Sequence, residues 1–133
     1  MQDLIRKAIE AREKSYCPYS GFAVGAALLT RSGKIYTGAN IENAAFTPTN
    51  CAERTAFFKA VSEGERDFSA IAIAGGKKGE EPRDYVTPCG VCRQVMREFG
   101  PDSFKIYSVR SEDDYKEYSL GELFPEGFGP DNL

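Results

Sequence analysis

Three cysteines and one glutamate of this 133-residue chain are spaced so that they could assemble a metal centre. One residue separates Cys51 from Glu53, and two residues separate Cys89 from Cys92. Residues three apart lie on the same face of a helix, so a helical segment would let Cys89 and Cys92 bind one ion. Cys51 would supply a third thiolate. Three protein ligands leave the fourth tetrahedral position of a zinc ion open, as in catalytic zinc sites.

Glu53 lies about 200° around an ideal helix from Cys51, so the two side chains cannot share a lateral face. Both can approach one centre only if that centre lies beyond the end of the helix. A metal ion there leaves the carboxylate free to act on a water molecule, as a general acid/base does. Taken alone, Glu53 could be a first-turn carboxylate that the helix dipole favours. Its position between the cysteines favours the catalytic interpretation.

The composition excludes several other kinds of chemistry. The chain has no histidine, which excludes Ser-His-Asp and Cys-His catalysis and every histidine-ligated metal site. Lys and Arg total 17 against 20 Asp and Glu, and a net charge of −3 argues against a nucleic-acid partner. No apolar run approaches the ~18 residues that span a bilayer, and no basic-then-apolar leader follows Met1, so we expect no membrane partner.

Four cysteines are too few for a small secreted disulfide scaffold, so we expect a reducing, cytoplasmic setting. In that setting the Cys89–Cys92 pair indicates metal or redox chemistry rather than a structural disulfide. Cys17 has no ligand-like spacing to the other cysteines. We therefore expect Cys17 to be a small buried side chain and not the fourth ligand of a closed structural site.

Periodicity and turn signals predict the elements that position these residues. In chain order, they are a helix that ends near Lys14, strands 24–30 and 35–40 joined as a hairpin, a helix 51–62, a strand 69–74, a helix 89–99, strands 104–109 and 115–118, and a short terminal helix capped by Ser119 and Glu122. This order predicts a single α/β domain over residues 1–133, built of two or three layers.

The two cysteine-bearing helices belong to successive crossovers around strand 69–74. If both crossovers are right-handed and progress in one direction, the helices lie side by side on one face of the sheet. Their N-termini then lie at the carboxyl edge of the strands, where α/β proteins usually place ligands. Helix N-termini also favour thiolate over thiol. We therefore expect Cys51 and Cys89 to meet at this edge.

The Cys-x-Glu and Pro-Cys-x-x-Cys spacing is the three-cysteine form of the zinc nucleobase deaminase pattern. Further stretches resemble the small homotetrameric cytidine deaminases over nearly the whole chain. The matching stretches are Tyr16–Ser20, Phe22–Leu28, Asn40–Ala44, Cys51–Ala56, Pro88–Gln94 and Glu122–Pro125. The resemblance implies a three-layer α/β/α fold with a mixed five-stranded sheet. It also implies one Zn²⁺ per chain, held by Cys51, Cys89 and Cys92 at the N-termini of two adjacent helices.

The resemblance further implies which residues bind a nucleoside substrate. Asn40 and Glu42 correspond to residues that bind the ribose, and positions i and i+2 of an extended segment project the same way. Phe22 would pack against the pyrimidine or the sugar, and the backbone around Ala52 would contact the base. Glu53 would be the catalytic acid/base. From local sequence alone, Asn40 could instead be a turn residue and Phe22 a core residue.

Two more residues receive roles from the resemblance. Zn²⁺ with three thiolates sums to −1, which weakens the metal as a Lewis acid, and a guanidinium donating to a ligand sulfur would partly restore its acidity. Arg54 resembles the family residue that does this, although it could be a plain surface residue. Phe128 lies in a Gly- and Pro-rich tail and resembles the residue that enters a neighbouring subunit's pocket in a homotetramer.

The sequence therefore predicts a hydrolase of pyrimidine salvage that converts cytidine and 2′-deoxycytidine to uridine nucleosides and ammonia. One alternative is a deaminase of a modified cytosine nucleoside or of an antibiotic with a cytosine head. Another is a non-catalytic, zinc-stabilised binding protein, and a third is a redox protein that uses the Cys89–Cys92 pair. Two features depart from the family pattern: the loop 75–87 is longer and more charged, and Pro48 is unexpected beside the site.

Overall fold

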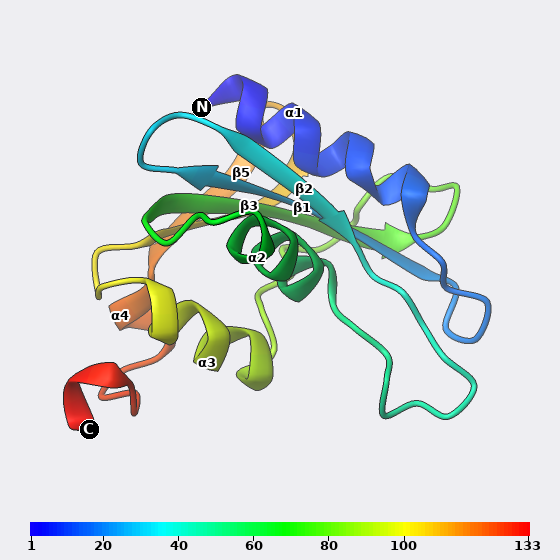
Figure 1. Ribbon diagram of the computed structural model, residues 1–133. Coiled ribbons are helices and arrows are strands. Elements are labelled where there is room, and N and C mark those ends of the chain that lie inside the picture. Colours follow the sequence, from blue (N-terminus) through cyan, green and yellow to red (C-terminus); the bar gives the residue numbers. More distant parts are fainter.

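A mixed five-stranded sheet forms the middle layer of the computed structural model, which describes residues 1–133 (Figure 1). The strand order is β2-β1-β3-β4-β5. The strands are β1 (Phe22–Thr30), β2 (Ile35–Ala39), β3 (Phe68–Lys77), β4 (Lys105–Ser111) and β5 (Asp114–Ser119). Only β3 and β4 pair in parallel, and the other neighbours are antiparallel. The predicted mixed sheet is confirmed.

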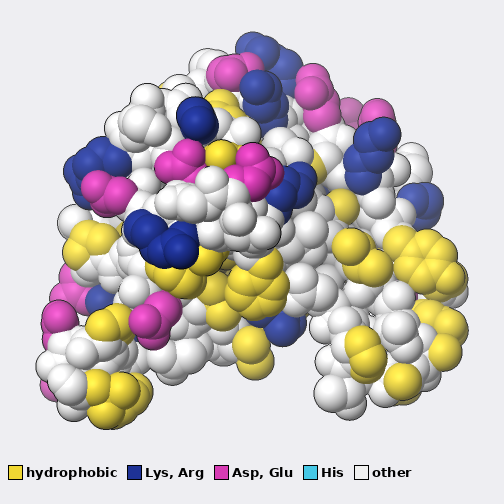
Figure 2. Space-filling model, viewed as in Figure 1, with side chains coloured by type: hydrophobic (Ala, Val, Ile, Leu, Met, Phe, Trp, Pro, Cys, Tyr) yellow, Lys and Arg dark blue, Asp and Glu magenta, His cyan; other side chains and the backbone are white.

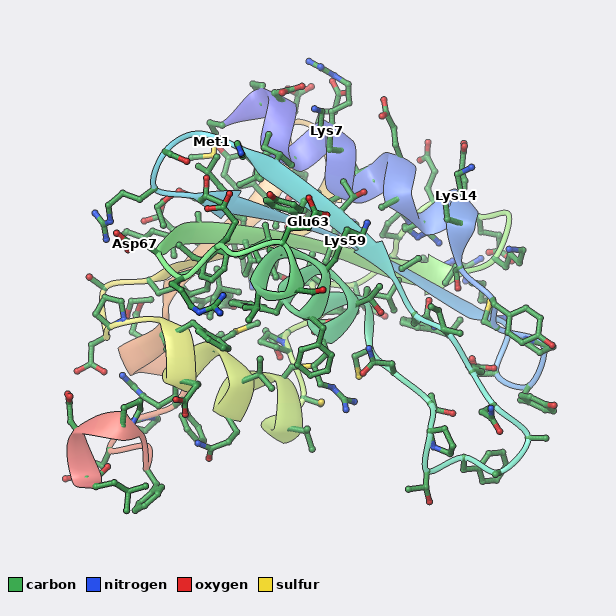
Figure 3. All side chains as sticks on the ribbon, viewed as in Figure 1. Met1, Lys7, Lys14, Lys59, Glu63 and Asp67 are labelled. Carbon is green, nitrogen blue, oxygen red and sulfur yellow. The ribbon has the colours of Figure 1, made fainter.

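Helices cover both faces of this sheet, which confirms the three-layer arrangement (Figure 1). On one face lies α1 (Gln2–Ala11), which continues as a 3₁₀ turn over Arg12–Lys14. On the other face lie α2 (Ala52–Ser62) and α3 (Gly90–Phe99), and a short α4 (Leu120–Leu123) follows β5. Lys7 of α1 and Lys14 of the 3₁₀ turn lie on the outer side of this layer, away from the sheet (Figure 3).

The alternation of side chains along the strands produces two separate cores. Ala70, Ala72 and Ala74 of β3 face α1, together with Leu4 and Ile5 of that helix. The intervening residues of β3 face the opposite way and pack against α2 and α3; this second core contains Ile71, Ile73, Phe57, Phe68 and Met96. The two cores bury both faces of the sheet, and α2 and α3 are fixed on one of them.

The backbone of α2 packs directly on β2. A Cβ added at Gly38 would lie 2.5 Å from the carbonyl oxygen of Ala52 and 2.6 Å from the amide nitrogen of Ala56. No larger residue fits at this position unless the helix moves, so Gly38 sets how closely the first turn of α2 approaches the sheet. The position of Cys51, immediately before this turn, depends on that contact.

The two crossovers place α2 and α3 side by side, as predicted. β1 is antiparallel to both β2 and β3, and β3 is parallel to β4, so β2, β3 and β4 run in one direction. The helices α2 and α3, which connect these strands, pack against each other on one face. Their N-termini therefore lie at the carboxyl edge of the strands (Figure 1).

The boundaries differ from prediction at one functionally relevant place. β3 extends to Lys77 instead of ending at residue 74, because Gly75 and Gly76 pair with Val24 and Ala23 of β1. The loop predicted for residues 75–87 is thus shorter, and only its part after Lys77 connects β3 to α3. None of the helices has the length and apolarity required to cross a membrane.

The short terminal helix carries the predicted capping box. The amide of Glu122 donates to Ser119 Oγ at 3.2 Å, and the amide of Ser119 donates to Glu122 Oε1 at 2.8 Å. This reciprocal pair fixes the start of α4 and thereby the place where the C-terminal segment leaves the sheet.

Candidate metal centre and active site

Three thiols meet where α2 and α3 begin. Cys51 is the N-cap residue of α2 and Cys89 is the N-cap residue of α3, each with extended backbone, and Cys92 lies one turn into α3. The three sulfur atoms lie within 4.8 Å of one another. No fourth Cys, Asp or Glu joins the group, and Cys17 is buried elsewhere. The structure therefore brings together the cysteines that the sequence analysis grouped as ligands.

The spacing of the thiols fits a zinc ion. Two sulfur ligands of a tetrahedral zinc, each about 2.3 Å from the metal, lie about 3.8 Å apart. The Sγ atoms of Cys51 and Cys89 are 3.8 Å apart. Cys89 is exposed and Cys51 is half-buried, whereas Cys92 is buried, so the cluster opens to one side. The donor set leaves one tetrahedral position for a non-protein ligand.

The electrostatics of the thiols also point to a cation. Hydrogen bonds from Cys92 and Arg54 outweigh partial burial and lower the pKa of Cys51 to about 5. The bond with Cys51, together with burial, raises the pKa of Cys92. The three sulfur atoms are too close for all of the thiols to ionise unless a positive charge lies among them. A divalent metal ion supplies that charge.

Arg54 contacts the cluster directly. Its Nη2 donates to Cys51 Sγ at 3.2 Å, and its Nε is buried without a partner. Burial opposes the charged form, but the bonds to Cys51 and Cys92 outweigh it and raise the pKa of Arg54. The guanidinium therefore stays positive beside the sulfur atoms. It is positioned to offset part of the negative charge of a three-thiolate site.

Glu53 lies at the same helix end with only 4% of its surface exposed. Burial raises the pKa of Glu53 to about 7, and the negative charge of Cys51 adds to this shift. A carboxyl group with a pKa near neutrality can both accept and return a proton at physiological pH. The structure thus places a buried carboxyl group with this capacity beside the thiols.

A cavity of about 320 Å³ opens beside the thiols, which is within the usual range for small-molecule sites. Its lining includes six of the predicted site residues: Phe22, Asn40, Cys51, Ala52, Glu53 and Cys89. Three larger surface hollows, two of about 680 Å³ and one of about 390 Å³, contain neither a cysteine nor a buried carboxylate. The smaller cavity is therefore the candidate active site.

Asn40 and Glu42 line adjacent cavities. The side chain of Asn40 accepts from the amide of Val24 at 2.9 Å and donates to the carbonyl oxygen of Phe22 at 2.8 Å. Glu42 instead lines a neighbouring cavity of about 390 Å³, which shares Thr49 with the first. β1 thus fixes the amide of Asn40 at the wall of the candidate active site.

Glu42 is held by the loop that precedes β1. Its carboxylate accepts from the amides of Tyr19, at 2.9 Å, and Ser20, at 3.1 Å, and from the Ser20 hydroxyl. The hydroxyl bond of Ser20 is the main reason that the pKa of Glu42 is lowered. The carboxylate is therefore charged and held in a fixed orientation at the edge of the neighbouring cavity.

Phe128 does not line the cavity of its own chain. Its side chain is 56% exposed, and its carbonyl oxygen accepts from Gln94 Nε2 at 2.8 Å. The C-terminal segment lies near the C-terminal end of α3, whereas the thiols lie at the N-terminal end (Figure 1). The ring of Phe128 is therefore available to another molecule and not to the site of its own chain.

The structure adds wall residues that the sequence analysis did not assign. Val86 and Thr87, from the segment before α3, line the cavity together with Val24, Asn50 and Ile73. For Val86 and Thr87, the only signal in the sequence is that they lie within three residues of Cys89.

Known proteins resemble this chain in sequence and structure. Residues 1–108 match the family described as "Cytidine and deoxycytidylate deaminase zinc-binding region". A cytidine deaminase of Sporosarcina psychrophila is 47% identical over 133 residues, covering 100% of this chain and 94% of that protein. A cytidine deaminase of Halalkalibacterium halodurans is 50% identical over 132 residues, with 99% and 96% covered. The crystal structure of cytidine deaminase from Burkholderia pseudomallei superimposes with a TM-score of 0.86 at 45% identity, covering 95% of this chain and 97% of that one.

We predict one zinc ion per chain with three sulfur ligands and one lighter ligand, measured by elemental analysis and X-ray absorption. Cys89→Ser should abolish tight zinc binding, because removal of one of three thiolates leaves too few ligands. Cys17→Ser is the matched control, because it removes a cysteine outside the cluster. Loss of zinc from the Cys17→Ser protein would overturn the proposed ligand set.

Proposed function

The chain belongs to the cytidine and deoxycytidylate deaminases, and from this premise we propose the reaction it catalyses and the residues that carry it. It is a zinc-dependent enzyme that hydrolyses cytidine to uridine and ammonia, and 2′-deoxycytidine is the second substrate that we propose. The observation that carries the assignment is a buried carboxylate beside three thiols that fit one zinc ion, at the wall of a nucleoside-sized cavity.

Cys51, Cys89 and Cys92 would hold the ion. Zinc bound there supplies Lewis acidity and lowers the pKa of water. Arg54 donates to Cys51 Sγ and withdraws charge from that sulfur, which keeps the three-thiolate site sufficiently electron-poor for this chemistry. The two helix N-termini act in the same direction, because their positive ends stabilise thiolates.

Glu53 carries the protons of the reaction. Its carboxylate accepts a proton from the attacking water and returns it to ring nitrogen N3, while the water oxygen bonds to C4. The carboxylate then moves the remaining hydroxyl proton to the exocyclic nitrogen, and the C4–N bond breaks to release ammonia. The products retain every atom of cytidine and water. Burial of Glu53 supports this role, because a desolvated carboxyl group accepts a proton more readily than an exposed one.

The remaining cavity residues would hold the nucleoside. Phe22 offers an apolar ring to the base or sugar, and Ala52, the first residue of α2, lines the cavity, where its backbone amide would donate to the base. One N–H of the Asn40 amide is used by Phe22, which leaves the second N–H for a ribose hydroxyl. Glu42 would accept from the same sugar at the boundary of the two cavities.

We further propose that the protein is a homotetramer in which Phe128 completes a neighbour's active site. Phe46 and Ile41 are 70% and 48% exposed on the segment between β2 and α2, where hydrophobic side chains gather at the lower right of Figure 2. The same view shows acidic and basic side chains interspersed. Large exposed apolar groups favour association with another subunit. The same reasoning applies to the exposed ring of Phe128.

The proposed biological role is pyrimidine salvage in the cytoplasm. A free nucleoside needs no unstacking from a nucleic acid, which agrees with the net charge of −3. A reducing compartment would keep the four cysteines as free thiols and leave three of them able to bind the metal.

We predict that Glu53→Gln retains fold and zinc but loses at least ~100-fold in kcat, the scale of a removed general acid/base. Glutamine keeps the shape of the side chain but cannot accept and return a proton. The control is Glu63→Gln, which neutralises an exposed glutamate at the other end of α2 (Figure 3). Near-wild-type turnover by the zinc-loaded Glu53→Gln protein would exclude the assigned proton carrier and the mechanism with it.

Arg54→Gln should lower kcat by about 10- to 100-fold, the range found for groups that support metal ligands, while KM changes less. The reason is that the thiolates keep more negative charge when the guanidinium is absent. Kinetics at saturating zinc test this expectation, with Arg6→Gln as the control, because Arg6 is an exposed arginine of α1 that does not line the active-site cavity. A change confined to KM would contradict the charge-tuning role of Arg54.

Phe128→Ala should be weakly active by itself, because each site lacks its neighbour's ring. Glu53→Gln and Phe128→Ala chains unfolded together and reassembled should regain part of the activity, since some sites then combine an intact Glu53 with a neighbour's intact Phe128. Native mass spectrometry of tagged chains verifies that hybrids form. Activity equal to the sum of the two parents in verified hybrids would show that Phe128 does not act across subunits.

A further inference from the structure

The segment Tyr85–Pro88 is the last part of the connection from β3 to α3, and hydrogen bonds from β4 and α3 fix its backbone (Figure 1). The hydroxyl of Ser108, on β4, donates to the carbonyl oxygen of Val86. Arg93 Nε, on α3, donates to the carbonyl oxygen of Pro88 at 2.7 Å. The segment is thus bound to the sheet on one side and to the metal-binding helix on the other, although it has no regular secondary structure.

This segment forms a wall of the active-site cavity. Val86 and Thr87 line the cavity immediately before Cys89. Val86 also approaches Phe22 above β3, where a Cβ added at Gly75 would lie 3.0 Å from the Phe22 ring and 3.2 Å from a Val86 methyl group. The wall therefore packs tightly on the strand, and a small shift of Val86 changes the space beside the thiols.

Tyr85 connects this wall to β5. Its hydroxyl donates to Asp114 Oδ1, and Lys116 Nζ lies 4.4 Å from the centre of its ring. The guanidinium of Arg110 lies 5.0 Å from the ring centre, and its Nε pairs with Asp114 Oδ2 at 3.5 Å. The hydrogen bond to Asp114 raises the pKa of Tyr85, so the hydroxyl remains a donor at neutral pH. Neither Tyr85 nor Asp114 lines the cavity.

We propose that Tyr85 is a positioning residue whose hydrogen bond to Asp114 holds the Val86–Thr87 wall against the reacting edge of the pyrimidine. The inference deepens the proposed function and rests on it. The carbon that reacts must lie beside the thiols, and the wall directly precedes Cys89. The substituents that flank this carbon, on the amino nitrogen and on C5, therefore face the wall. A wall held in place discriminates against a methyl group at either position.

The test compares kcat/KM for cytidine with kcat/KM for N4-methylcytidine and 5-methylcytidine. Tyr85→Phe removes only the hydroxyl group and should raise the relative rate of at least one methylated substrate several-fold. Val86→Ala removes atoms of the wall itself. It should raise kcat/KM for a methylated substrate, relative to cytidine, by about tenfold, which is the scale on which a pocket discriminates one methyl group. Asp114→Asn keeps an acceptor oxygen and should change the ratio less than Tyr85→Phe does.

Tyr36→Phe is the matched control, because it removes a hydroxyl that donates to a carboxylate, that of Glu65 at 3.2 Å, outside the active-site cavity. If Tyr85 only stabilised the fold, its loss would lower kcat/KM for cytidine, N4-methylcytidine and 5-methylcytidine by the same factor. The proposal requires the ratio of methylated substrate to cytidine to change. Unchanged ratios in Tyr85→Phe would overturn it, and Asp114→Ala breaks the same bond if Tyr85→Phe does not fold. Failure of the wild-type protein to deaminate cytidine would instead refute the proposed function.

Discussion

The active site depends on bringing two helix N-termini close enough for their capping cysteines to share one metal ion. Cys51 and Cys89 lie at the starts of different helices, and their sulfur atoms are 3.8 Å apart. Cys92 lies with them, all three sulfur atoms being within 4.8 Å of one another, and three thiolates this close repel one another unless a cation lies between them. The fold holds the helices in place by burying them on one face of the sheet. The close contact of Gly38 with α2 sets the distance between that helix and the sheet. Metal affinity and packing of the core are therefore linked.

The thiol cluster could be predicted from sequence because each step toward it is local or topological. Helix starts at Cys51 and Cys89 follow from periodicity and flanking residues, and the handedness of crossovers brings those starts to one edge. The extension of β3 to Lys77 could not be predicted in this way. Glycines have low strand propensity, and pairing with β1 decides the conformation of Gly75 and Gly76.

The surroundings of the site were less predictable, because they depend on contacts between residues distant in sequence. Asn40 and Glu42 are two residues apart on an extended segment, which predicts that they converge on one sugar. The bonds that fix the Glu42 carboxylate come from Tyr19 and Ser20, which are 23 and 22 positions away in the sequence. Tyr85 and Asp114 are 29 positions apart and carry no motif. Such contacts follow from how loops pack on the finished sheet, and periodicity does not encode them.

We infer that turnover of cytidine requires one zinc ion at the three thiols. The direct measurement follows the ultraviolet loss of cytidine by the purified protein, after chelation and during stepwise return of zinc. We predict no activity in the zinc-free protein and activity that rises linearly up to one zinc per chain. Full activity of a protein shown to be free of metal would contradict it, as would a fully zinc-loaded protein that leaves cytidine unchanged.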